Sequence, residues 1–243
     1  LNMNDGVVSG TNGFMGITTN GGVTWAQSNP GFSTTVDVQF PAKSTWFTIS
    51  DRNGQYQIGR KLETNNTITV NPVIGIEGFW NGSTQVADTV TLELRNSTSP
   101  YALVASKKAV ITPGIGYGTF EYSSVGAGSY YVVVKHRNTI ETWSASPIAM
   151  TPGGNYNYDF TTAATQAYGS NMVLKLGRHC IYSGDTDQDG SVDATDFSQV
   201  DNDAFNFVSG YVATDVTGDN SVDASDAAIV DNNAFNFVQK ITP

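Results

Sequence analysis

The sequence predicts a mainly β protein that ends in a small helical module, and three observations support this fold class. Only 14% of the 243 residues are charged, and Gly, Ser, Thr and Asn are abundant, as is typical of strands joined by turns. Alternating apolar residues, such as Val90, Leu92 and Leu94, predict half-buried strands. Near the C-terminus, a 24-residue acidic segment occurs twice, and each copy ends in a predicted helix.

Residues 1–66 are expected to form a first β segment, which contains the stretch Thr-Thr-Asn-Gly-Gly-Val-Thr-Trp. In this stretch Asn20 would bond the turn backbone, Gly22 would adopt an unusual φ and Trp25 would pack on the sheet. The stretch resembles an Asp-box, the turn of sialidase-like β-propeller blades, which implies a blade-like segment with a structural turn. Sialidase activity is not expected, because the segment has no arginine cluster for an acidic sugar. The strands expected here are Gly6–Gly10, Gly13–Ile17, Val36–Phe40, Trp46–Ser50 and Tyr56–Ile58.

Residues 67–178 are expected to form a β-sandwich, because about seven short strands alternate with Pro and Gly turns. Phe120-Glu-Tyr122, followed by the run Gly-Ala-Gly-Ser-Tyr-Tyr-Val-Val-Val-Lys, resembles prealbumin-like domains of bacterial surface proteins. That resemblance covers about residues 72–178 and implies an Ig-like fold of two sheets. The expected strands are Val90–Leu94, Tyr101–Val104, Ala109–Ile111, Thr119–Tyr122, Tyr130–Val134, Ile140–Trp143, Tyr156–Phe160 and Met172–Leu176.

Two features of this region invite a functional interpretation. Lys135-His-Arg-Asn138, with Glu141 and Trp143 nearby, is either a functional cluster or the end of an edge strand with solvated charges and a packed Trp. The second interpretation is preferred. The single cysteine, Cys180, has no partner for an internal disulfide and is interpreted as a small buried hydrophobe.

The duplicated unit lies within residues 179–243, where Asp185–Val208 and Asp215–Val238 are identical at 15 of 24 positions. Each copy begins with a 12-residue loop that offers oxygen atoms at positions 1, 3, 5, 7, 9 and 12, the spacing of a calcium loop. Position 6 must turn sharply, which Gly190 and Asn220 tolerate best. The sequence therefore predicts two calcium ions. The candidate ligands are Asp185, Asp187, Asp189, the Ser191 carbonyl, Asp193 and Asp196 in loop one, and Asp215, Thr217, Asp219, the Ser221 carbonyl, Asp223 and Asp226 in loop two.

Both loops differ from an ordinary EF-hand, because no helix enters them and Asp stands at position 12 where Glu is usual. Two such units of loop and exit helix resemble a dockerin, the calcium module that binds cohesin domains, over about residues 182–240. The resemblance implies calcium binding and assembly with a protein partner outside the cell. Two departures concern the partner and leave the calcium ligands intact. The Ser/Thr pair of dockerins at positions 10 and 11 is Ala194-Thr195 and Ala224-Ser225, and the basic pair that follows is Asp201-Asn202 and Asp231-Asn232.

The helices of the unit are expected over Asp196–Asn206 and Asp226–Asn236. They are rich in poor helix formers, and their apolar stripes are short, so calcium is expected to be needed for their folding. At position 8 of each loop an apolar residue would pack where the two loops meet. The stripes are Phe197, Val200 and Ala204, and Ile229, Val230 and Ala234; the position-8 residues are Val192 and Val222.

Charge is distributed unevenly along the chain. From residue 179 onward, twelve Asp and Lys240 give a net charge of −11, whereas residues 1–178 hold 10 acids and 11 bases. There is no basic patch or nucleic-acid motif, so a nucleic-acid partner is not expected. No run reaches the roughly 18 apolar residues of a transmembrane segment. The chain begins at Leu1 without a signal peptide, and a processed or partial chain is expected.

No set of residues supports catalysis, so the sequence predicts a secreted, non-catalytic calcium-binding protein of a bacterial surface. Self-association into an extracellular fibre is preferred, because residues 1–66 hold about one and a half blades whose edge strands need partners. Two alternatives remain open: a dockerin-bearing component that binds a cohesin, and the non-catalytic C-terminal part of a glycan-acting enzyme. Asn65, Asn81 and Asn96 begin Asn-x-Ser/Thr triplets and are candidate positions for surface glycans.

Overall fold

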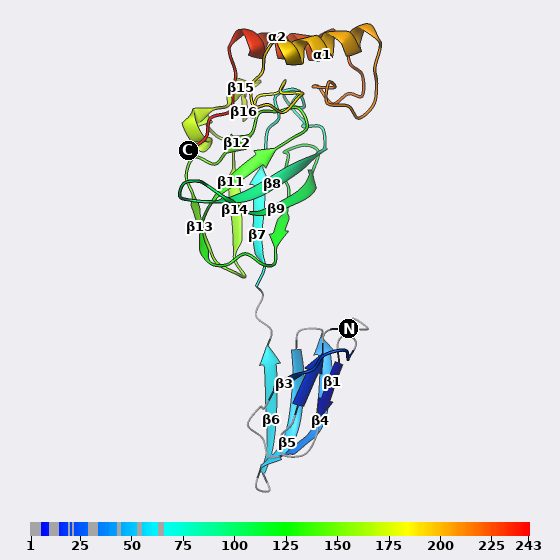
Figure 1. The fold of residues 1–243 in the computed structure, drawn as a ribbon, viewed down its shortest axis with the longest axis vertical. Helices are drawn as coiled ribbons and strands as arrows, with labels where there is room; N and C mark the ends of the chain where they lie inside the picture. The colour runs from blue at the N-terminus through cyan, green and yellow to red at the C-terminus, as the bar shows by residue number, and fades with distance from the viewer. Residues whose placement is uncertain are drawn as a thin grey trace. The chain divides into compact units, whose positions relative to one another are not determined.

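The computed structural model divides into two compact units, Leu1–Asn65 and Asn66–Pro243 (Figure 1). Each unit is described by itself. The division of the second unit into a sandwich and a C-terminal module at residue 178 stays a prediction. The structure describes residues 6–9, 15–18, 20, 22–28, 34–42, 45–52, 55–62 and 66–243.

In the first unit, the described strands form two antiparallel sheets of three strands each, with the orders β1-β2-β3 and β4-β5-β6. The strands expected within residues 36–58 lie inside β4, β5 and β6, which confirms them. The strands are β1 Gly6–Ser9, β2 Met15–Thr18, β3 Ala26–Ser28, β4 Thr34–Ala42, β5 Thr45–Arg52 and β6 Gln55–Leu62.

The turn between β2 and β3 has the expected local bonds. The side-chain oxygen of Asn20 accepts from the Thr24 N–H at 2.9 Å, and the Thr18 hydroxyl oxygen accepts from the Gly22 N–H at 2.9 Å. Gly22 has a φ of 88°, where a side chain would be strained. The Trp25 ring covers Gly22 and is 45% exposed. The identification of this turn as an Asp-box, and of the segment as a propeller blade, stays a prediction.

The second unit begins with a sandwich of two sheets, so the expected mainly β fold class is confirmed. One sheet has the order β10-β7-β14, and the other has the order β12-β11-β8-β9, with β13 also pairing with β11. The strands are β7 Ile68–Val73, β8 Asp88–Asn96, β9 Leu103–Ile111, β10 Phe120–Tyr122, β11 Gly128–Lys135, β12 Thr142–Trp143, β13 Ile148–Met150, β14 Asn155–Asp159, β15 Val173–Lys175 and β16 Arg178–Cys180.

The core of the sandwich lies between these two sheets. The expected alternation holds in β8, where Val90, Leu92 and Leu94 are at most 1% exposed and pack in one cluster with Val132 of β11 and Ile68 of β7. Burial of apolar side chains from both sheets in one cluster supplies the main stabilisation of this part.

Several features of the sandwich differ from the sequence-based expectation, including strand β13, which was not expected. Strand β9 is continuous, although its centre is polar, because its outer face is exposed to solvent. Strand β7 was not expected, because Asn71 and Pro72 are typical turn residues; the buried Asn71 amide instead bonds the side chains of Asn155 and Asn157. Those partners lie on β14, which runs parallel to β7, so the sandwich is not wholly antiparallel.

The C-terminal module contains two helices, α1 Ala194–Phe205 and α2 Ala224–Phe235, which lie side by side in Figure 1. Both begin two residues earlier than expected, because a capping box starts each one. The Asp193 side chain accepts from the Thr195 N–H at 2.7 Å, and the Asp196 side chain accepts from the Asp193 N–H at 3.0 Å. Among the described residues, no helix is long and apolar enough to cross a membrane.

The two helices run antiparallel. Loop one pairs through Ser191 with Gln239, which follows α2, and loop two pairs through Ser221 with Ser209, which follows α1. The apolar stripes and position-8 valines are confirmed as core residues, since they gather in one cluster with Ile140 of the sandwich. The buried members of this cluster are Ile140, Val192, Val200, Val216, Val222, Val230 and Val238.

Candidate calcium-binding site

Loop one brings three carboxylates together. Asp185, Asp187 and Asp189 each offer an oxygen, and these oxygens lie within 4.8 Å of one another. Asp187 and Asp189 are exposed, whereas Asp185 is 2% exposed and its Oδ1 atom has no hydrogen-bond partner. A buried carboxylate oxygen without a partner is costly, and a hard cation at this point would satisfy it.

Loop two has the same residues at the ligand positions, with one change at position 3. The Asp215 Oδ1 atom accepts from the N–H groups of Gly218 at 2.8 Å and Asp219 at 3.2 Å. At position 3, the Thr217 hydroxyl is buried and has no partner, so this loop also contains an unsatisfied oxygen. Position 6 turns as expected, with a φ of 70° at Asn220 and 97° at Gly190 in loop one. The residues present therefore fit a calcium ion in each loop.

The twelfth residue of each loop holds the loop against its helix. Asp196 is 1% exposed; its Oδ1 atom accepts from the Thr186 N–H at 2.7 Å, while its Oδ2 atom accepts from the cap residue. Asp226 is fully buried; its Oδ1 atom accepts from the Thr217 N–H at 2.8 Å, and its Oδ2 atom accepts from the Asp223 N–H at 2.9 Å. The structure thus places all twelve predicted ligand residues in the two loops, with positions 1 and 12 buried and positions 5 and 9 exposed.

The acidic loops are electrostatically unfavourable without a cation. Burial, and then the nearby carboxylates of Asp196, Asp189 and Asp187, raise the pKa of Asp185 to about 7. Burial also raises the pKa of Asp226. At neutral pH a bound divalent cation would replace the proton that this arrangement otherwise favours on Asp185.

We expect calcium to reverse the pH dependence of the module's stability. In a chelator, the folded-state pKa of Asp185 is about 7 and lies above the ordinary value of 3.8, so the folded state holds more protons between these two values. Stability without calcium should therefore fall as pH rises from about 4 to 7. With calcium bound, the same carboxylate must be deprotonated, and stability should rise over that range.

Helix content by far-UV circular dichroism at several pH values, with calcium or with EDTA, measures this effect, because the fraction of folded module reports its stability. In EDTA this fraction should be highest at about pH 4 and low at about pH 7. The Asp185→Asn variant is the matched control, because it keeps the size of the side chain and cannot ionise; its folded fraction in EDTA should be less dependent on pH. Parallel pH profiles in calcium and EDTA would contradict the expectation.

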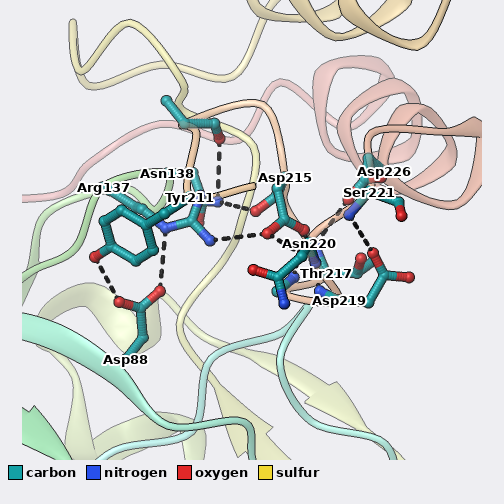
Figure 2. Close-up of polar contacts among 12 residues, drawn as sticks. Asp88, Arg137, Asn138, Tyr211, Asp215, Thr217, Asp219, Asn220, Ser221 and Asp226 are labelled. Carbon is teal, nitrogen blue, oxygen red and sulfur yellow. Dashed lines mark hydrogen bonds and ion pairs between the residues drawn. The ribbon is translucent and has the colours of Figure 1, made fainter. Parts of the chain in front are cut away.

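The sandwich contacts loop two directly through the turn that follows β11 (Figure 2). The Asn138 side chain is fully buried and donates to the backbone carbonyls of Asp215 at 2.8 Å and Ala213 at 3.1 Å. Beside it, the Arg137 guanidinium lies 3.3 Å from the Asp215 Oδ2 atom and 3.0 Å from the Asp88 Oδ2 atom. The first ligand residue of loop two is thus held by the sandwich through both its backbone and its side chain.

Asp88 is the centre of this contact on the sandwich side. It accepts from the Tyr211 hydroxyl at 2.6 Å and lies 3.1 Å from the Nε2 atom of the buried His136. Burial opposes ionisation of Asp88, but the close contact with His136 and the hydrogen bond from Tyr211 outweigh it and keep the pKa of Asp88 below its usual value. Burial lowers the pKa of His136. The Tyr211 ring also covers Arg137, with 4.5 Å between the guanidinium carbon and the ring centre.

A second contact joins the sandwich to α2. The Asn233 side chain is 1% exposed and donates to the Glu77 carboxylate at 2.7 Å and to the Ser183 carbonyl at 2.8 Å. Burial raises the pKa of Glu77 despite these bonds. The corresponding residue of the first repeat is Asp203, which instead accepts from the Thr214 hydroxyl at 2.6 Å. The two repeats therefore differ at this position: Asn233 bonds the sandwich, whereas Asp203 bonds a residue within the module.

These contacts correct the expectation for Lys135–Asn138. Trp143 is packed as expected, and its ring N–H donates to Glu141 at 2.6 Å. His136 and Asn138, however, are buried against the module and are not solvated. The run of polar residues at the end of β11 signalled the end of a strand, but no local pattern in the sequence points to a partner about 77 residues away. Cys180 is buried as expected, and burial raises its pKa to about 12.

Loop one is expected to bind calcium more tightly than loop two. It has an acidic residue at position 3, where loop two has neutral Thr217, and it turns through Gly190 where loop two uses Asn220. The Arg137 cation beside Asp215 also repels a second cation in loop two. Calorimetry should show weaker residual binding in the Asp185→Ala variant than in Asp215→Ala. The opposite order of residual affinities would contradict this ranking.

Comparison with known proteins defines this module. Residues 183–234 match the model of the dockerin type I domain. The C-terminal module is a dockerin type I domain. Dockerin type I domains bind calcium, and the cluster of Asp185, Asp187 and Asp189 is consistent with a calcium loop, so the predicted cofactor is confirmed.

Two solved structures are similar to the chain over a larger part of its length. Both are complexes of a type II cohesin with an X-module and dockerin from Acetivibrio cellulolyticus, carrying mutations at the C-terminal or N-terminal interface. They are 17% identical to this chain, cover 70% and 71% of it and 99% of their own chains, and have TM-scores of 0.41 and 0.38. No curated protein matches the chain significantly.

The dockerin match also bears on activity and location. A dockerin is a non-catalytic module, and dockerins occur in extracellular cellulosome components. The prediction that the whole chain lacks catalytic activity is not tested by this match, since the match covers residues 183–234 alone.

Proposed function

We propose that this chain is a secreted component that docks, through its calcium-loaded dockerin, onto a cohesin domain of another bacterial extracellular protein. The observation that carries the proposal is the duplicated unit of acidic loop and exit helix, which matches the dockerin model and leaves both helices with exposed faces. This function was the alternative in the sequence analysis, and the dockerin match supports it better than self-association.

In this proposal two calcium ions hold the docking surface in shape. The ligands are the carboxylates at positions 1, 3, 5, 9 and 12, with Thr217 at position 3 of loop two and the carbonyls of Ser191 and Ser221 at position 7. Each ion would draw its loop together at the start of α1 or α2, where Asp193 and Asp223 cap the helices. Extracellular calcium is near millimolar, so even weak sites of this kind fill.

The sandwich would act as the platform on which the dockerin is held. Asn138, Arg137 and Glu77 contact loop two and α2, so the side of the module that carries these contacts is covered. The outward faces of the two helices, which carry Asp201 and Asp231, remain exposed and available to a partner.

A binding assay with purified cohesin domains tests the proposal. We expect a cohesin to bind the chain in about 1 mM calcium, which is roughly the extracellular concentration, and to dissociate in EDTA. The double variant Asp185→Ala/Asp215→Ala should not bind, whereas Glu121→Gln, which changes an exposed carboxylate on β10, should bind normally. The proposal fails if no cohesin binds in calcium, or if EDTA leaves the affinity unchanged.

Self-association through the N-terminal strands stays a prediction. In the described part of the first unit, β1 and β3 are the outer strands of one sheet, and β4 and β6 are those of the other. Ultracentrifugation of the full chain and of a variant without residues 1–65 would test it, since only the full chain should form larger species. The alternative that the chain is the non-catalytic end of a glycan-acting enzyme, and the candidate glycan positions, also stay predictions.

A further inference from the structure

Four phenylalanines of the dockerin are almost fully exposed. Phe205 and Phe207 are 82% and 88% exposed, and Phe235 and Phe237 are 81% and 86% exposed. Each pair lies in the same five residues, Ala-Phe-Asn-Phe-Val, at the end of a helix. A single exposed apolar residue needs no explanation, but two pairs of exposed aromatic rings in equivalent places mark an interaction surface.

The backbone at these positions is strained for phenylalanine. Both helices end in a Schellman motif: after α1, the Val208 N–H donates to the Asp203 carbonyl and the Phe207 N–H donates to the Ala204 carbonyl, and α2 ends in the same way. The residue after the cap in this motif takes a left-handed conformation that glycine adopts at little cost. Phe207 and Phe237 occupy it with φ values of 51° and 53°. Because both rings are exposed, no burial of apolar surface offsets this backbone strain. The strain therefore points to a role in binding another molecule.

Each phenylalanine pair has an acidic neighbour on its helix. Asp201 precedes Phe205 by four residues, and Asp231 precedes Phe235 by four, so each acid and ring share one helix face. Both aspartates are exposed and have no basic partner among the described residues. Because the helices run antiparallel, one such pair lies beside loop two and the other beside loop one. The module therefore presents two equivalent anchors at opposite ends.

We infer that these two anchors, Asp201 with Phe205 and Phe207, and Asp231 with Phe235 and Phe237, select a cohesin whose docking face has an apolar recess bordered by lysine or arginine. The inference rests on the proposed docking function and names the chemistry of the partner. The charge of the module indicates that the partner's docking face is basic. Residues 179–243 carry −11, and two calcium ions reduce this only to −7. A buried aromatic ring supplies affinity, and charge of opposite sign supplies specificity and a fast association rate.

A second copy of this chain is a poor occupant of the same surface. Its own dockerin is equally acidic. Residues 1–178 hold 10 acids and 11 bases, so the rest of the chain has almost no net positive charge to offer. Like charges brought together across an interface weaken it.

Glycine substitution at the strained positions separates a binding role from a structural role. The double variant Phe207→Gly/Phe237→Gly relieves the left-handed strain and removes two exposed rings, so its melting temperature should rise by about 2–4 °C. Its affinity for the cohesin should fall by about ten-fold or more, because anchor residues carry most of the binding energy. Phe205→Ala/Phe235→Ala should lose affinity without gaining stability, and Val110→Ala, an exposed apolar residue of β9, should change neither.

The probe is a set of purified cohesin domains whose docking faces range from acidic to basic, with binding measured in calcium at low and high salt. We expect the basic-faced domains to bind, with an affinity that falls as salt rises, and Asp201→Lys/Asp231→Lys to shift the preference toward acidic-faced domains. If acidic-faced domains bind the unaltered chain equally well, or if the phenylalanine variants bind as it does, the inference is overturned while docking stands. If no cohesin binds, the proposed function fails and the inference fails with it. The inference would also be overturned if the unaltered chain self-associates independently of salt and the phenylalanine variants do not. That result would identify a second copy as the occupant.

Discussion

Removal of calcium is expected to abolish most of the helical signal of this protein while its sandwich stays folded. Without the ions, the module carries −11, and its loops hold unsatisfied oxygens of Asp185 and Thr217 in buried positions. Its core contains mostly valines, and its helices are rich in Asp and Asn, which are poor helix formers. Calcium at about 1,000 times its dissociation constant stabilises the folded state by about 4 kcal/mol for each site. Loss of two such contributions exceeds what a small module can tolerate.

Far-UV circular dichroism in calcium and in EDTA measures this loss, with readdition of calcium to show that it is reversible. The double variant Asp185→Asn/Asp215→Asn is the control, because its spectrum should not respond to either reagent. The aromatic near-UV signal from buried Trp143 of the sandwich should persist in EDTA. An unchanged helix signal and melting temperature after chelation would show that the module folds without calcium.

The second large effect is expected from Asn138→Ala. This substitution leaves the buried carbonyl of Asp215 without its donor, at a cost of about 1–3 kcal/mol, and also removes the donor of the partly buried Ala213 carbonyl. Because the Asp215 carbonyl belongs to the first residue of loop two, we expect calcium affinity to fall in that loop more than in loop one. The dockerin should also become less firmly attached to the sandwich, and more easily cleaved by proteases in the connecting residues.

Calorimetry with calcium, denaturant unfolding and limited proteolysis together measure this variant. Asn202→Ala is the matched control: its side chain is exposed on α1 and bonds only the Ser198 carbonyl one turn earlier, so its removal should change each quantity little. Equal calcium affinities of loop two in the Asn138 variant and the unaltered chain would show that the sandwich does not support that loop.

Local patterns in the sequence were sufficient to predict most elements of the dockerin. Ligand spacing at positions 1 to 12 depends on a dozen consecutive residues, so it is readable without a fold. The helices begin two residues earlier than expected, because Asp193 and Asp223 act as both loop residues and helix caps, and they end one residue earlier, at Phe205 and Phe235. In the sandwich, alternation predicted β8 and the apolar run Tyr130–Val134 predicted β11, whereas the buried Asn71 and Pro72 concealed β7.

The sequence by itself determined the calcium loops, the two exit helices and the mainly β character of the rest, because each of these depends on residues near one another in the chain. The tertiary structure alone decided the parallel pairing of β14 with β7, the attachment of loop two to Asn138 and Arg137, and the exposure of the phenylalanine pairs. The strand pairing and the attachment of loop two depend on contacts between residues tens of positions apart. The exposure of the phenylalanines depends on the absence of such contacts. An apolar residue at a helix end has the same local pattern whether it is buried or presented to a partner, and only the packed chain distinguishes the two.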